Sequence, residues 1–252
     1  MLKSTLLGLV FLVIASALEA GQATIDSFKA EVEASLNAQI EITESIAPGG
    51  DMGETYCQVR PVAIRLEANL PAELREAVLS HELGHAILCA RGIYILDALT
   101  DDAKRNPHAD LLGAFTGAMA SCYIDPLADA EAEKRGFRPN LTVDEIARRT
   151  EMHTRHQISD AVKAGGELQV RFIAMALYCT ELRPHSFRMQ DLEQHLVVEP
   201  MIIETFHKYQ RDLGSPTCSD WTSCFALTKR LRDELGLSQQ IRIWDFDIHA
   251  LE

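Results

Sequence analysis

The run from Pro71 to Gly92, PAELREAVLSHELGHAILCARG, constrains the fold more than any other part of the 252-residue chain. It opens with a proline, has no internal proline and closes with a glycine, which are the start and stop signals of a helix. Its apolar side chains cover a broad surface, so the helix must be buried against other elements. These apolar residues are Leu74, Ala77, Val78, Leu83, Ala86, Ile87 and Leu88.

The same helix contains the motif HELGH, in which His81 and His85 stand one turn apart. Both imidazoles can therefore reach one zinc ion, while Glu82 points toward a water molecule beside it. This is the arrangement expected of a metallopeptidase with Glu82 as the general base. Gly84 costs about 1 kcal/mol of helix propensity relative to alanine, so we expect another segment to approach the backbone closely there.

A catalytic zinc ion usually takes three protein ligands, so two histidines leave one ligand to be found. The metzincin motif would place a third histidine where this chain has Arg91, which excludes that pattern. A downstream carboxylate is the natural substitute. The best candidate segment is SCYIDPLADAEAEKRGF, Ser121–Phe137, where carboxylates and alanines recur at helical spacing and Gly136 marks a helix end.

Within this segment Asp125, Ala128, Asp129 and Ala132 share one helical face. Their spacing resembles the third-ligand helix of gluzincin-type peptidases, as in the ImmA/IrrE family and the HtpX and CAAX prenyl protease family. The resemblance implies an α+β, zincin-like fold, with Asp125 as the third metal ligand in place of the usual glutamate. It also implies that Asp129 holds a ligand histidine through its other ring nitrogen.

Other interpretations of this segment remain open at the level of sequence. Asp125 precedes Pro126 and would also make a good helix cap. Asp129, Glu131 and Glu133 are alternative third ligands, and Asp129 is equally interpreted as a solvated carboxylate on the helix surface.

Before the HELGH helix, the sequence predicts a helix over 25–38 and strands over Gln39–Ile46 and Gln58–Leu66. By the resemblance, the strand that leads into the helix lies at the edge of a small sheet and pairs with an extended substrate. After the helix, we expect a polar surface loop over Ile93–Asp110 and a helix over Leu111–Ala120.

The rest of the chain is mostly helical in pattern, and its last residues, QQIRIWDFDIHALE, predict a strand or an extended arm. Pro200 should kink or split the third of four helices, which are Thr142–Lys163, Glu167–Leu182, Met189–Leu213 and Asp220–Leu235. We therefore expect a signal peptide (1–20), a zincin-like catalytic core (21–139) and a helical C-terminal subdomain that completes the cleft (140–252).

The first residues have one lysine, an apolar run from Leu6 to Ala17 and then small residues, which is the pattern of a secretory signal. The apolar run is shorter than the roughly 20 residues that span a membrane. We expect the mature protein to be exported to the periplasm or the extracellular space, without strong membrane association; the alternative is an uncleaved membrane anchor.

Export gives meaning to the even number of cysteines, because disulfides persist in an oxidising compartment. Cys218 and Cys224 could close a small loop around Trp221, and a Cys89–Cys122 bond would tether the two segments that carry the predicted ligands. The six cysteines, which allow three bridges, are Cys57, Cys89, Cys122, Cys179, Cys218 and Cys224.

The formal charge of −13 and the pI near 5.1 argue against nucleic acid and anionic lipid as partners. The sequence instead predicts zinc-dependent hydrolysis of a peptide or protein substrate. Tyr178, Arg183 and His185 are candidates for stabilising the transition state. The alternatives are an inactive zinc-binding or protein-interaction domain of zincin fold, and a structural domain in which HELGH is a coincidence. The oligomeric state stays open.

Overall fold

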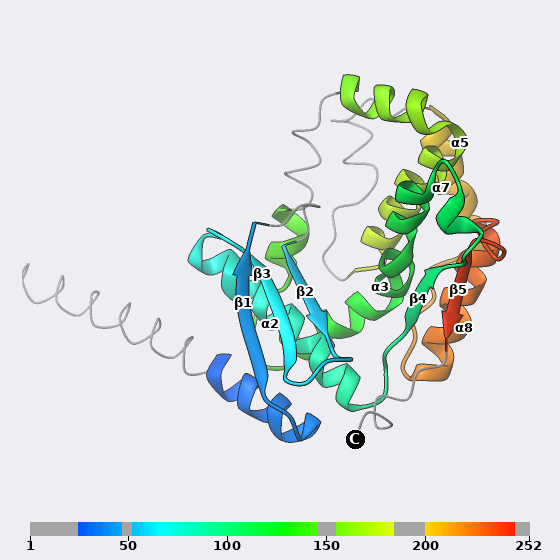
Figure 1. Ribbon diagram of the computed structural model, residues 1–252. Coiled ribbons are helices and arrows are strands. Elements are labelled where there is room, and N and C mark those ends of the chain that lie inside the picture. The colour runs from blue at the N-terminus through cyan, green and yellow to red at the C-terminus, as the bar shows by residue number, and fades with distance from the viewer. Residues whose placement is uncertain (1–24, 47–51, 146–154, 184–199, 245–252) are drawn as a thin grey trace, which may run out of the picture.

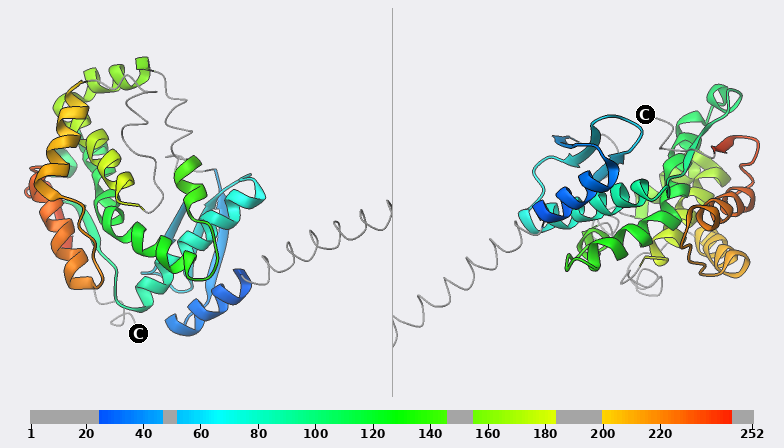
Figure 2. Two further views of the ribbon diagram at one scale, coloured as in Figure 1. Left: turned by 180° about the vertical axis from the view of Figure 1, so that it is seen from behind. Right: turned by 90° about the horizontal axis from the view of Figure 1, so that it is seen from below.

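A computed structural model describes residues 25–46, 52–145, 155–183 and 200–244 of the chain (Figure 1). A small sheet and the helix over 25–36 lie on one side of the molecule, and α5, α7 and α8 lie on the other, with α2 and α3 between them (Figures 1 and 2). This arrangement confirms the predicted α+β class, with a small N-terminal sheet on the HELGH helix and a mostly helical remainder. The predicted signal lies outside the described residues.

The small sheet has the strand order β1–β3–β2. β1 (Ile40–Ser45) is parallel to β3 (Val62–Glu67), and β2 (Gly53–Tyr56) is antiparallel to β3. Along β3, Val62, Ile64 and Leu66 are buried, as the alternation of apolar and other side chains predicts. The prediction that the strand before the HELGH helix is an edge strand is wrong, because β3 is central and the edge next to α2 is β2.

The HELGH helix, α2 (Ala72–Ala90), follows the predicted boundaries. Pro71 is its N-cap residue, and Gly92 has a φ of 74° just after its end, where an L side chain would be strained. Residues 77–84 and 86–89 are buried. The prediction that α2 must be buried on a broad surface is therefore confirmed.

The next segment holds more regular structure than the polar loop we expected. β4 (Leu96–Leu99) pairs antiparallel with β5 (Ile241–Trp244), and a short 3₁₀ helix, η1 (Ala103–Arg105), follows β4. The pairing joins residues about 140 positions apart, which no local pattern reveals. The C-terminal strand was one of the two structures predicted for that end.

The two helices predicted over Leu111–Ala120 and within Ser121–Phe137 form one helix, α3 (Ala109–Glu133), with a kink at Thr116 and Gly117. Asp125 and Pro126 both lie inside it, so Asp125 does not cap a helix. By length and hydropathy α3 could span a membrane, and among the described helices it is the one that could. α3 packs against α2, α5, α8 and β4, so its apolar composition is that of a core helix.

The C-terminal part is helical as predicted, with different boundaries. Residues 140–145 are helical, α5 (Arg155–Glu181) continues through a break at Gly166, and α7 (Pro200–Leu213) and α8 (Trp221–Glu234) follow. α7 is described from Pro200 on, and because residues 184–199 lie outside the described residues, the predicted kink or split at Pro200 stays a prediction. The predicted domain boundary near residue 139 stays a prediction.

Two hydrophobic cores flank the middle of the molecule. One joins the helix over 25–36, the small sheet, one side of α2 and the end of α3. The other joins most of α3 to α5, α7, α8 and β5. Because α2 and α3 contribute to both cores, polar side chains between them are held from two sides.

Three disulfides join the elements, and they indicate an oxidising, extracytoplasmic environment. The bonds are Cys57–Cys89, Cys122–Cys179 and Cys218–Cys224. The small loop around Trp221 is thus confirmed, whereas the Cys89–Cys122 bond is wrong. Cys89 lies on the side of α2 that meets the β2–β3 loop, and Cys122 lies on the side of α3 that meets α5.

Behind the two central helices, Glu131 accepts hydrogen bonds from Arg91 at 2.8 and 3.1 Å, Lys134 at 2.6 Å and Arg135 at 3.0 Å. Arg135 also pairs with Glu31 on the first helix. Burial would raise the pKa of Glu131, but hydrogen bonds from these three cations outweigh burial and lower the pKa to about 2. The network therefore joins α2, α3 and the first helix.

We expect Glu131→Gln to destabilise the protein at pH 6 by about 1.5–3 kcal/mol, the range for hydrogen bonds to a charged group. The folded-state pKa lies below the ordinary value of 4.5, so this stabilisation is present above pH 4.5 and is lost as the pH falls toward 2. Urea unfolding of both proteins from pH 6 downward measures the difference, with Glu204→Gln on the exposed face of α7 as the control. A pH-independent difference would contradict the assignment.

Candidate metal centre

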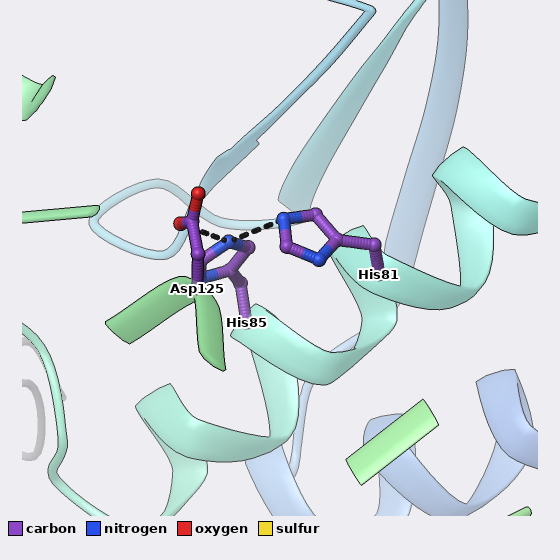
Figure 3. Close-up of side chains that lie close together, drawn as sticks. All are labelled: His81, His85 and Asp125. Atoms are coloured by element: carbon purple, nitrogen blue, oxygen red, sulfur yellow. Dashed lines mark hydrogen bonds and ion pairs between the residues drawn. The ribbon is translucent and has the colours of Figure 1, made fainter. Parts of the chain in front are cut away.

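His81 and His85 on α2 and Asp125 on α3 form the one group of possible metal ligands found in the described part of the chain. Their ligand atoms all lie within 4.8 Å of one another. The Nε2 atoms of the two histidines are 3.1 Å apart, and His85 Nε2 is 3.3 Å from Asp125 Oδ1. Figure 3 shows the two imidazoles on successive turns of α2, directed toward the carboxylate on α3. The structure thus brings together the residues that the motif and the resemblance singled out.

The spacing of these atoms suits a tetrahedral ion. With metal–ligand distances of about 2.0–2.1 Å, two ligand atoms of a tetrahedral site lie about 3.3 Å apart. Two of the three separations are already near this value. The side chains of His85 and Asp125 are 18% and 21% exposed, so solvent reaches the cluster. A partly open site of three donors is typical of catalytic zinc rather than structural zinc.

Asp129 orients the first histidine. Its Oδ1 lies 2.7 Å from His81 Nδ1, which leaves His81 Nε2 directed toward His85. A carboxylate on Nδ1 fixes the tautomer and the ring orientation, and it strengthens Nε2 as a donor. This is the position that the resemblance implied for Asp129. The carboxylate is only 2% exposed, so the interpretation as a solvated surface group does not fit.

Arg183, just after α5, binds the same carboxylate from the other side. Its Nε and Nη2 donate to Asp129 Oδ2 and Oδ1 at 2.8 and 2.9 Å, and Nη2 also donates to Thr142 Oγ1 at 3.1 Å. Its Nη1 lies 3.7 Å from Asp125 Oδ2. The side chain is 7% exposed. The geometry gives Arg183 a supporting place behind both carboxylates, which sequence alone did not suggest.

The charges of the cluster shift its pKa values in consistent directions. Burial would raise the pKa of Asp125, but the hydrogen bond with His85 and the charge of Arg183 lower it well below its usual range. Burial would lower the pKa of His85, but Asp125 and the nearby carboxylates Glu82 and Asp129 raise it. Asp129 also has a lowered pKa, because His81 and Arg183 outweigh its burial. Asp125 and Asp129 are therefore held in their ionised form.

Glu82 has its own partner on the edge strand. Thr55 Oγ1 donates to Glu82 Oε2 at 2.7 Å and lies 3.0 Å from the backbone oxygen of the same residue. Gly53 makes room for this carboxylate, because a Cβ there would lie 2.6 Å from Glu82 Oε1. The sequence analysis missed β2 and Thr55, since GETY has neither apolar alternation nor any motif.

The remaining candidates lie apart from the cluster or outside the described residues. Tyr178 donates its hydroxyl to the backbone oxygen of Gly214 at 3.0 Å, so that group is engaged elsewhere. His185 lies outside the described residues. Glu131 belongs to the network behind α2 and α3, and Glu133 is exposed. Of the four carboxylates considered as third ligand, Asp125 is the one that groups with the two histidines.

Comparisons with protein-family models, curated proteins and solved structures found no match to this chain.

We expect Asp129→Asn to weaken zinc binding about 10–100-fold, the range seen when a carboxylate behind a metal ligand is lost. The amide no longer fixes the tautomer of His81 and leaves Arg183 without its closest counter-charge. Competition with a coloured chelator measures the affinity, and thermal melting shows that the variant is folded. Asp144→Asn, at an exposed position nearby, is the matched control. Equal affinities for wild type and Asp129→Asn would show that Asp129 does not hold the ligand.

Proposed function

We propose that the protein is a zinc-dependent peptidase in which His81, His85 and Asp125 hold the metal ion and Glu82 is the general base. The observation that carries this proposal is the His81–His85–Asp125 cluster, with ligand atoms within 4.8 Å of one another, on the same helix as Glu82. The buried support of His81 by Asp129 adds to it, because a histidine with a fixed tautomer is a better metal ligand than a free one.

The donor set and the charge favour a divalent ion, and zinc in particular. Two imidazoles and one carboxylate form the ligand set of many catalytic zinc sites. Around the cluster, three carboxylates (Glu82, Asp125 and Asp129) and one guanidinium (Arg183) leave a formal charge of −2 with both imidazoles neutral. One divalent ion balances that charge. The raised pKa of His85 reflects the same excess of negative charge.

A zinc ion bound here would polarise the scissile carbonyl group and lower the pKa of a bound water molecule to near neutral. Glu82 takes the proton from the attacking water and then delivers it to the leaving amine. The hydroxyl of Thr55 holds one oxygen of Glu82, so the carboxylate keeps one orientation through the reaction. Arg183 keeps Asp125 and Asp129 ionised and in place, and it acts behind the site.

We propose an extended peptide as the substrate. β2 is an edge strand of the described sheet and carries Thr55, which contacts the general base. A peptide that adds to this edge would lie alongside Glu82, held in register by backbone hydrogen bonds. The acidic chain and its disulfides suit an exported protein that acts on peptides or proteins rather than on nucleic acid.

The decisive experiment combines metal content with hydrolysis. We expect purified protein to bind one zinc ion, to cleave casein, and to lose both properties in excess chelator and regain them with zinc. Glu82→Gln should keep the zinc and lose hydrolysis by about 100-fold or more, because it removes proton transfer but no ligand. Glu76→Gln, the same change at a partly exposed position of α2, is the control.

The competing interpretations give different results. A zinc-binding protein without peptidase activity would bind the metal and leave casein intact in the wild type. A domain in which HELGH is a coincidence would bind no stoichiometric zinc. Equal hydrolysis by the wild type and Glu82→Gln would refute the proposed mechanism.

A further inference from the structure

Gly84, between the two histidines of α2, lies against the backbone of α3. A Cβ atom built at Gly84 would lie 2.4 Å from the backbone oxygen of Ala128 and 2.9 Å from its C and Cα atoms. Such contacts involve the backbone of α3, which cannot swing aside as a side chain can. The sequence predicted that another segment approaches the backbone at Gly84, and the structure confirms it. That segment is α3, the helix that carries Asp125.

The contact lies at the level of the metal cluster. Gly84 directly precedes His85, and Ala128 stands three residues after Asp125 on the same face of α3. The distance between the two helix backbones at this level therefore decides how far a carboxylate on α3 must reach toward the histidines.

The length of the side chain at position 125 also decides whether its carboxylate reaches the histidines. Aspartate is shorter than glutamate by one methylene group, a bond of about 1.5 Å. The resemblance implied a glutamate at position 125, yet the shorter aspartate already places Oδ1 only 3.3 Å from His85 Nε2. A short side chain reaches the histidines here, next to the point where the backbone of α3 leaves no room for a Cβ at position 84.

We propose that Gly84 is a positioning residue that matches the α2–α3 distance to an aspartate ligand, so that Gly84 and Asp125 work as a pair. This inference rests on the proposed metal site and specifies how the site is assembled. A methyl group at position 84 pushes α3 away and leaves Asp125 short of the ion, and a glutamate at position 125 restores the reach. In the close-packed wild type, a glutamate is too long for the space.

The test is a double-mutant cycle on zinc affinity, measured by chelator competition with the full chain, with thermal melting in parallel. The four proteins are the wild type, Gly84→Ala, Asp125→Glu and the double variant. Gly113→Ala is the matched control, because it makes the same change in α3 at a position with nothing within 4 Å of the added Cβ.

Each single substitution should weaken zinc binding about tenfold or more, as misplaced ligands do. The double variant should bind zinc at least about fivefold more tightly than Gly84→Ala. Because Asp125→Glu alone weakens binding roughly tenfold, this is a coupling of about 50-fold, within the range seen for residues in contact. Gly113→Ala should bind like the wild type. A glycine needed only for packing would give losses that add, because the glutamate would not help.

The pairing is overturned if the double variant binds no more tightly than Gly84→Ala, or if Asp125→Glu binds as tightly as the wild type. Should Gly84→Ala fail to fold, Asp125→Glu alone decides, because it leaves the helix contact untouched. A wild type that binds no zinc overturns the proposed function and this pairing with it. A wild type that binds zinc and shows additive losses overturns the pairing alone.

Discussion

The ion pair between Asp129 and Arg183 is the interaction on which the candidate site depends. Both side chains are almost fully buried, at 2% and 7% exposure. Removing one partner from such a pair costs about 3–5 kcal/mol, because the other charge is left without compensation. The pair is tolerated since its polar atoms have partners: His81 and two nitrogens of Arg183 bind Asp129, and Thr142 accepts from the guanidinium. Four segments of the chain therefore meet at one satisfied network.

This network explains why the site needs the C-terminal helical part. The HELGH helix and α3 supply the ligand atoms, but the charge that keeps Asp125 and Asp129 ionised comes from the end of α5. The Cys122–Cys179 disulfide joins α3 and α5 three residues before Asp125 and four before Arg183. On the other side, Cys57–Cys89 joins the end of β2 to the end of α2. Disulfides thus tie α3 to α5 on one side of the candidate site and the β2–β3 loop to α2 on the other.

Local chemistry made the centre of the site predictable. The helix around HELGH, the face shared by Asp125 and Asp129, and the close approach at Gly84 all follow from helical spacing and from the cost of a glycine within a helix. These features depend on residues within one or two turns of each other. The α+β class followed from the same periodicities, because the strand β3 and the buried helix α2 have clear patterns.

The features that sequence did not reveal depend on distant pairings. The position of Arg183 in the chain made it a candidate for stabilising the transition state. Its partner Asp129 is 54 residues away, on α3. β2 has four partly exposed residues and no alternation, so only its pairing with β3 defines it. Similarly, β4 becomes a strand by pairing with β5. Six cysteines allow fifteen pairings, and only the packing of α2 and α3 against different neighbours selects the one observed.

The comparison of Asp125 with Asp129 shows how one helix gives two carboxylates different tasks. They stand one turn apart on α3 and face the same guanidinium, but Asp129 is enclosed while Asp125 keeps about a fifth of its side chain exposed. Both oxygens of the enclosed carboxylate are bound by His81 and Arg183, which suits it to orienting His81. Asp125 faces the histidines through Oδ1, and its contact with Arg183 through Oδ2 is longer, so its partly exposed carboxylate stays accessible to an ion. Burial, rather than residue type, separates the candidate metal ligand from the residue behind it.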